Sequence, residues 1–155
     1  MAKEEQILNY TYRLLAHRAY SEQEIKQKLE QRFPEHSALQ AGVVQKLKDY
    51  HYLDDQAFAE SWIKNRMRLN PRGRFLLERE LKQKGIAATS IQTALAKIGF
   101  QEEETAQELV AHKAPQWEKL EPIKRKQKIC QLLSARGFGW ETIQKCLKNS
   151  RNGCG

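Results

Sequence analysis

The sequence lacks the features by which several classes of protein are recognised. No run reaches the roughly 18 apolar residues that a membrane-spanning helix needs. The first ten residues carry charges of both signs and contain no apolar stretch of signal-peptide length. Cysteine is scarce, with three residues and no C-x-x-C pair, and the four histidines are scattered, so neither a disulfide framework nor a metal site is predicted. We expect a cytoplasmic protein with reduced thiols and no metal or other cofactor.

Enzyme motifs are also missing. There is no glycine-rich phosphate loop of the G-x-x-x-x-G-K type, no H-E-x-x-H and no ordered nucleophile–base set. Asp54 and Asp55 are the only adjacent aspartates, and capping of the helix that follows accounts for them better than a two-metal nuclease does, because neighbouring residues at a helix start point in different directions. We therefore expect a binding protein and not an enzyme.

Positive charge is what the sequence has in excess. The net charge is +8 and the isoelectric point is about 9.5, which favours polyanionic partners: nucleic acid, a nucleoprotein or an anionic membrane. Residues 51–100 carry +4 and residues 101–155 carry +3, whereas residues 1–50 carry only +1. A polyanion is therefore expected to meet the later two-thirds of the chain.

The apolar residues repeat. One pair, spaced four apart, recurs at an interval of 52 residues: Ile25 with Leu29, Leu77 with Leu81, and Ile129 with Leu133. A second pair recurs at intervals of 48 and then 52 residues: Val43 with Leu47, Ile91 with Leu95, and Ile143 with Leu147. This spacing indicates helices, and a further helix precedes the first pair of each repeat, over 10–17, 57–68 and 104–113.

Helix boundaries follow the same repeat. Lys84 and Arg136 each precede a glycine, as cations at helix ends commonly do. Ser21 and Glu24 form a capping-box pattern, and Pro122 suits the first position of a helix.

The predicted fold is all-α, with nine helices in three tandem three-helix bundles. Their predicted boundaries are 1–53, 54–100 and 101–155, and the last includes a short disordered tail that contains Cys154. Units of this kind expose an apolar flank unless they stack in series, which produces an elongated, curved array. No stretch alternates with the period of a strand, and Tyr50–Leu53 is expected to link the first two repeats.

The second repeat contains a specific motif: Tyr52-Leu53-Asp54-Asp55-x-x-Phe58-Ala59, then Arg66, Gly73 and Glu80-Leu81-x-x-Lys84-Gly85-Ile86. This pattern resembles the RecX family. The other repeats agree with it in Ser21-Glu22-Gln23-Glu24-Ile25-x-x-Lys28-Leu29 and in Arg136-Gly137-Phe138, so the resemblance covers about residues 8–148. Departures at Arg74 and Gly139 affect only local helix starts.

The resemblance implies a bacterial protein that binds the RecA recombinase and lies in the groove of the RecA–DNA filament. Such a protein is a negative modulator: it inhibits ATP hydrolysis, strand exchange and co-protease activity, and so regulates recombinational DNA repair and the SOS response. The alternative is a free-standing, non-specific nucleic-acid-binding protein, since three-helix units resemble helix-turn-helix modules. No long heptad pattern argues for a dimer, so a monomer is expected.

Two basic runs are the candidate binding residues. The first carries +6 between residues 64 and 84, and the second lies near residue 125. The candidates for partner or nucleic-acid binding are Arg66, Arg68, Arg72, Arg74, Phe75, Arg79, Lys82, Lys124, Arg125, Lys126 and Lys128. A solvated helix surface would explain the same charges, although such a density of one sign is unfavourable without a polyanionic partner.

Two aromatic residues have competing interpretations. Phe75 falls opposite the inward pair Leu77 and Leu81 on a helical wheel. It either anchors a partner together with Arg79 and Lys82 or folds back onto Leu69 or a neighbouring repeat. Trp62 is four residues after Phe58, a spacing that predicts a core residue, with stacking on nucleic-acid bases as the alternative.

Overall fold

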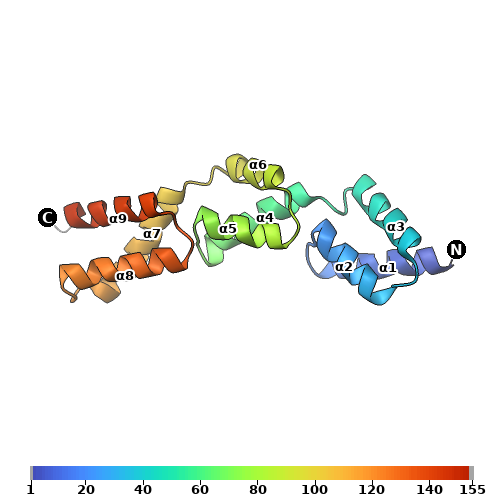
Figure 1. Cartoon of the computed structure of the whole chain (residues 1–155), viewed down its shortest axis with the longest axis horizontal. Helices are drawn as coiled ribbons and strands as arrows, with labels where there is room; N and C mark the ends of the chain where they lie inside the picture. Colours follow the sequence, from blue (N-terminus) through green and yellow to red (C-terminus); the bar gives the residue numbers. More distant parts are fainter. Residues whose placement is uncertain (1, 154–155) are drawn as a thin grey trace. The chain divides into compact units, whose positions relative to one another are not determined.

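The computed structural model describes residues 2–153, and every regular element in that range is helical (Figure 1). The elements are α1 (Ala2–His17), α2 (Glu22–Arg32), α3 (Ser37–Asp49), α4 (Asp55–Leu69), α5 (Arg74–Gln83), α6 (Ala88–Ile98), α7 (Glu102–Lys113), the short 3₁₀ helix η1 (Ala114–Trp117), α8 (Pro122–Ala135) and α9 (Trp140–Gly153). The predicted all-α class is confirmed. Cys154 lies outside the described residues.

Helices α1, α2 and α3 enclose one apolar core. Its fully buried side chains come from all three helices, and α2 begins with the predicted capping box between Ser21 and Glu24. The core consists of Ile7, Ile25, Leu29, Val43, Val44, Leu47 and Leu53. Because Ile7 is buried in this core, α1 begins eight residues earlier than the predicted helix over 10–17.

Helices α7, α8 and α9 enclose a second core of the same kind. Trp117 of η1 packs against its edge, and Pro122 stands at the start of α8 as predicted. The core consists of Ala106, Leu109, Ile129, Leu133, Phe138, Ile143 and Cys146.

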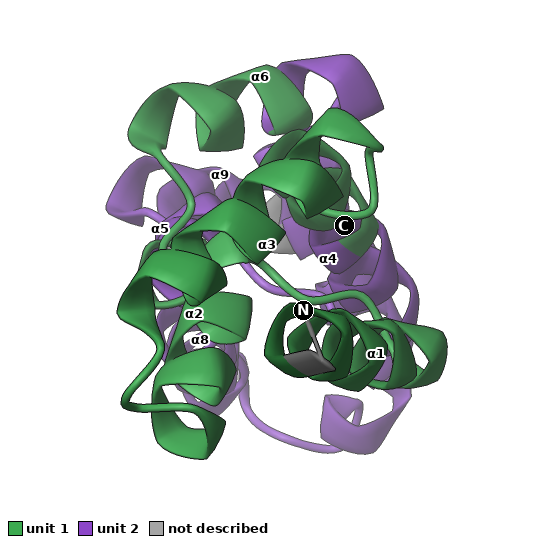
Figure 2. Ribbon diagram, turned by 90° about the vertical axis from the view of Figure 1, so that its right-hand side faces the viewer, with its two compact units in different colours: residues 1–61, 81–94 green, residues 62–80, 95–155 purple. Residues whose placement is uncertain are grey.

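Helices α4, α5 and α6 are shared between two compact units. One unit comprises residues 1–61 and 81–94, and the other comprises residues 62–80 and 95–155 (Figure 2). In the first unit these helices bury Phe58, Ala59, Leu81, Ile91 and Ala94. In the second unit they bury Ile63, Leu77 and Leu95.

The repeated apolar pairs occupy equivalent inward positions. All six members of the first pair are at most 1% exposed, and of the second pair only Leu147 is partly exposed. The predicted helix ends also hold, since Gly85 and Gly137 have φ of +82° and +79°, the left-handed conformation that follows many helices.

The described residues contain neither a membrane-spanning helix nor a cluster of metal-ligating side chains. Over residues 2–153, no helix combines the length and the apolar character needed to cross a membrane. In the same range, no three His, Cys, Asp or Glu side chains are grouped so as to hold a metal ion.

We predict that Leu81→Ala lowers the free energy of unfolding by roughly 2–5 kcal/mol, because Leu81 is fully buried and its truncation leaves a cavity. Thermal or urea unfolding measures the loss. The neighbouring Lys82→Ala, at an exposed position on the same helix, is the control and should change stability little. Equal stability of the two variants would contradict the repeat alignment.

Candidate functional site

Glu80 of α5 gathers donors from several positions in the basic run. One of its oxygens accepts a hydrogen bond from the indole Nε1 of Trp62 at 3.0 Å and one from Nε of Arg66 at 3.3 Å. Its other oxygen pairs with the guanidinium of Arg72. The guanidinium of Arg66 also lies over the indole ring, 4.8 Å from its centroid. Arg66 and Arg72, which were predicted to bind a partner, are thus both paired with Glu80 of the same chain.

These contacts divide the candidate cations by accessibility. The Arg72 side chain is only 12% exposed, so its role is to hold Glu80, whereas the Arg66 side chain is 33% exposed and keeps an accessible edge. Trp62 is only partly buried, so the expectation of a core residue is wrong. The reason is its indole N–H, which needs a polar partner and finds one in Glu80 at the rim of the bundle.

The exposed part of the first basic run lies on α4 and α5. Arg68, Arg79 and Lys82 are all exposed. Phe75 is 68% exposed, and Leu69, onto which it was alternatively expected to fold, is itself 71% exposed. Phe75 is therefore not packed away, and an apolar ring lies at the surface of the helix that carries Arg79.

Arg74 makes contacts within the protein, although its side chain is 44% exposed. Its backbone N–H donates to the carboxylate of Glu102 at 3.0 Å. Its guanidinium lies 3.9 Å from an oxygen of Glu78 and 5.8 Å from the ring centroid of Phe100.

Arg68 also lines a hollow of about 370 Å³ with His112, Lys113 and Arg136. Helices α4, α7 and α8 all end beside this hollow, so their carbonyl groups bring partial negative charge to it. The cations offset that charge, and the hollow by itself does not indicate an anion site.

The second basic run occupies the first two turns of α8. Lys124 and Lys128 are exposed, Lys126 is partly exposed, and Arg125 donates a hydrogen bond to the carbonyl of Leu120 at 3.1 Å. The macrodipole places partial positive charge at a helix start, so cations there are unfavourable for the helix itself. Helix stability therefore does not explain this run.

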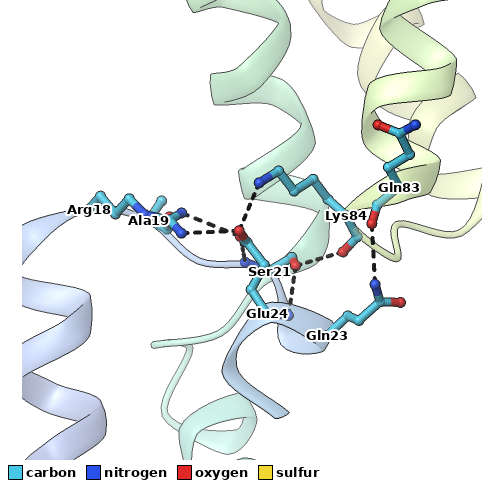
Figure 3. Close-up of polar contacts among 7 residues, drawn as sticks. All are labelled: Arg18, Ala19, Ser21, Gln23, Glu24, Gln83 and Lys84. Atoms are coloured by element: carbon cyan, nitrogen blue, oxygen red, sulfur yellow. Dashed lines mark hydrogen bonds and ion pairs between the residues drawn. The ribbon is translucent and has the colours of Figure 1, made fainter. Parts of the chain in front are cut away.

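A polar joint connects α2 to the end of α5 (Figure 3). The hydroxyl of Ser21 donates to the carbonyl of Lys84 at 2.7 Å while it caps α2 by accepting from the backbone N–H of Glu24. The Lys84 ammonium forms an ion pair with the Glu24 carboxylate at 2.9 Å, and the Gln23 side-chain amide donates to the carbonyl of Gln83. We call these contacts the first joint.

The electrostatics of the first joint centre on Glu24. Burial raises the pKa of its carboxyl, but hydrogen bonds from Arg18, Lys84 and the backbone of Ser21 outweigh that effect and lower the pKa to about 2. The carboxylate is therefore ionised at neutral pH and holds two cations.

A second joint repeats the first at an offset of 52 residues. Gly73, equivalent to Ser21, donates its backbone N–H to the carbonyl of Arg136, equivalent to Lys84, at 2.7 Å. The Arg136 guanidinium donates hydrogen bonds to the side-chain oxygen of Asn70 at 2.6 Å and to the carbonyl of Pro71 at 3.0 Å. The start of α2 is thus joined to the end of α5, and the start of α5 is joined in the equivalent way to the end of α8.

Carboxylates at the starts of α4 and α7 complete the two joints. The first backbone N–H of α2, on Glu22, donates to Asp55 at 2.9 Å, as that of Arg74 on α5 does to Glu102. Glu102 also accepts from the hydroxyl of Thr142 at 2.7 Å. Sequence reasoning assigned Asp55 to capping of its own helix and missed this second role, because the contact joins residues distant in the chain.

Close backbone approach explains two glycines of the second joint. A Cβ added to Gly73 would lie 2.4 Å from the carbonyl oxygen of Gly137, and one added to Gly137 would lie 2.4 Å from Cβ of Leu76. Serine is possible at position 21 because there the hydroxyl, and not the amide, reaches the carbonyl.

Comparison with known families accounts for this repeated architecture. The chain matches the descriptions "RecX, first three-helix domain" over residues 8–41, "RecX, second three-helix domain" over residues 54–95 and "RecX, third three-helix domain" over residues 101–147. The chain belongs to the RecX family. The first joint links residues of the first and second RecX domains, and the second joint links residues of the second and third.

Curated relatives carry the name "Regulatory protein RecX". The protein of Chlorobaculum tepidum is 33% identical over 146 residues, which cover 94% of this chain and 89% of the relative. The protein of Leuconostoc mesenteroides is 28% identical over 138 residues, 88% of this chain but 51% of the relative, so the chain spans about half the length of some RecX proteins that it matches.

Solved structures agree on the fold. RecX from Lactobacillus salivarius superposes with a TM-score of 0.83 at 22% identity, covering 96% of this chain and 97% of that one. A second structure, titled a regulatory protein RecX, has a TM-score of 0.78 and covers 92% of this chain and 72% of that one.

We predict that Gly137→Ala weakens the RecX fold more than Gly99→Ala does. Both glycines have positive φ, so alanine costs about 1–2 kcal/mol at either position. Only at Gly137 would the added Cβ also collide with Leu76, which adds roughly 1–3 kcal/mol of overpacking, whereas nothing lies within 4 Å at Gly99. Chemical denaturation of both variants measures the difference, and equal destabilisation would contradict the close approach at the second joint.

We predict that the first joint loses stability in acid. Because the Glu24 pKa is lowered in the folded protein to about 2, its contribution is complete above pH 4.5 and declines as the pH falls towards 2. Glu24→Gln should lose about 1–3 kcal/mol at neutral pH and flatten this acid limb. Urea unfolding between pH 2 and pH 7 tests it, with the exposed Glu30→Gln of the same helix as control. An unchanged acid limb in Glu24→Gln would be incompatible with the assignment.

Proposed function

We propose that this chain is a negative modulator of RecA that binds the RecA–DNA filament in its groove. In this role it inhibits ATP hydrolysis, strand exchange and co-protease activity, and thereby regulates recombinational repair and the SOS response in the cytoplasm. The observation that carries the proposal is membership of the RecX family across all three helical domains, whose relatives are named regulatory proteins.

The placement of charge supports contact with a nucleoprotein. Arg66 and Arg72 are paired with Glu80, but other cations of α4 and α5 remain exposed. The start of α8 also carries cations, which the dipole of that helix disfavours. The proposed contact residues are Arg68, Phe75, Arg79, Lys82, Lys124, Arg125, Lys126 and Lys128, with Arg66 and Arg74 contributing at their accessible edges. Phosphates and acidic side chains of a filament are both complementary to such a surface.

We further propose that the three repeats, bounded at 1–53, 54–100 and 101–155, act together as a monomer without a cofactor. The joints bear only on the connection of neighbouring repeats, because each links the start of the second helix in one repeat to the end of the second helix in the following repeat.

A free-standing nucleic-acid binder is the second candidate, because the same exposed cations suit bare DNA. The two functions differ in stoichiometry and partner. A RecA modulator suppresses the DNA-dependent ATPase of RecA at substoichiometric amounts while its affinity for bare single-stranded DNA stays weak. A non-specific binder inhibits only at amounts that cover the DNA.

We predict that Phe75→Ala and Arg79→Ala each reduce inhibition of the RecA ATPase by about tenfold or more, since an exposed aromatic beside a cation is a common interface anchor. The measurement is the concentration for half-inhibition, after circular dichroism has established unchanged helicity and melting. Leu69→Ala, at another exposed apolar position, and Lys28→Ala, at an exposed cation of α2, are matched controls. Full inhibition by both folded test variants would remove this surface from the interface.

A further inference from the structure

Three exposed tyrosines gather on the first repeat. Tyr12 of α1 is 40% exposed, and Tyr50 and Tyr52, between α3 and α4, are 68% and 56% exposed. The rings of Tyr12 and Tyr52 meet edge to face with centroids 5.5 Å apart. Lys46 is near enough for Tyr50 and Tyr12 to add to the rise of its pKa, which its hydrogen bond to Glu4 mainly causes. We call the three residues the tyrosine patch.

The patch lies where the first repeat departs from the second. His51 is equivalent to Gly99, 48 residues later, and both have positive φ, +63° and +73°. Gly99 is followed directly by the buried Phe100, whereas Tyr52 is an additional residue between His51 and the buried Leu53. The extra residue places an aromatic ring at the surface instead of in the core.

This departure is unfavourable for the fold alone. A residue with a side chain in the left-handed region costs about 1 kcal/mol relative to glycine, and the second repeat avoids that cost. The exposed part of each ring also gains nothing from burial in the free protein. Local strain together with exposed aromatic surface is typical of a binding site.

The charges around the patch distinguish between possible partners. The two lysines that shortly precede Tyr50 in the chain are both paired, Lys46 with Glu4 and Lys48 with Glu22 at 3.1 Å. Arg13 follows Tyr12 but points about 100° away around the helix. Nucleic-acid sites need cations for the phosphates beside the rings that stack on bases, and this patch offers few.

We propose that the tyrosine patch binds the protein component of the filament, the RecA protomer, and not its DNA. Tyrosine suits a protein surface because its ring buries apolar area with little loss of side-chain freedom, while its hydroxyl bonds to acceptors at the rim. The inference rests on the proposed function and assigns different contacts to different repeats. The first repeat contacts protein, and the basic surfaces of the later repeats contact phosphates.

Two binding assays on the full chain test this division. The double variant Tyr50→Ala/Tyr52→Ala is compared with wild type for affinity to single-stranded DNA alone and to RecA filaments formed on that DNA. We expect filament affinity to fall about tenfold or more and affinity for bare DNA to stay unchanged. The control is Trp140→Ala, which removes an exposed aromatic residue of α9 and should alter neither.

Salt provides a second measurement. Tyrosine side chains release no counterions when they bind, so the ratio of wild-type to variant filament affinity should stay constant as salt increases. By contrast, Lys124→Ala/Lys126→Ala/Lys128→Ala should reduce the salt slope of binding by about 0.7 for each single-strand phosphate that the variant no longer neutralises.

Each remaining outcome overturns a defined statement. Unchanged filament binding by the folded tyrosine variant overturns the patch as an interface. An equally weakened affinity for bare DNA also overturns it and assigns the rings to bases. A wild-type chain that binds DNA but shows no preference for the filament overturns the proposed function, and the inference with it.

Discussion

The bond between the start of one repeat's second helix and the end of the next repeat's second helix is the constraint on which the rest of this structure depends. A helix start has unpaired N–H groups and a helix end has unpaired carbonyls, and both are unfavourable when buried alone. In the second joint the Gly73 amide donates directly to the carbonyl of Arg136, whereas in the first joint the Ser21 hydroxyl both accepts from the start of α2 and donates to the carbonyl of Lys84. Repeats connected in this way need little apolar surface between them, which suits a chain with modest hydrophobic content.

The two joints share a geometry but differ in chemistry. The first holds an ionised carboxylate between two cations, Arg18 and Lys84, and therefore responds to acid and to salt. The second depends on close backbone contact at Gly73 and Gly137, and its cation, Arg136, binds the neutral Asn70 side chain instead of a carboxylate. In the third repeat the equivalent of Ser21 and Gly73 is Arg125, which lies inside α8 because that helix starts a turn earlier, at Pro122. The basic residues around Arg125 thus occupy the position at which the first two repeats form their joints.

The basic composition has two different uses. Some cations neutralise acidic groups or helix ends within the protein, as Arg72 does at Glu80 and Arg136 does beside Asn70. Others, such as Arg79 and Lys124, stay exposed, and the proposed function uses them to contact a polyanion. A count of charges along the sequence cannot separate the two, because the separation depends on which carboxylates the fold brings within reach.

The sequence by itself determined the helical class, the repeat and its inward residues, because burial of one helix face imposes a regular spacing of apolar residues. That spacing is kept when the residue type changes: Ile25, Leu77 and Ile129 are all buried at equivalent positions. It also contained the helix-ending glycines, since only a left-handed residue continues the chain there. Only the tertiary structure decided the partners of Glu80, the partial exposure of Trp62 and the surface position of Tyr52. Those features depend on contacts between residues distant in sequence, or on one extra residue in a link, and neither alters the periodic pattern from which the helices were predicted.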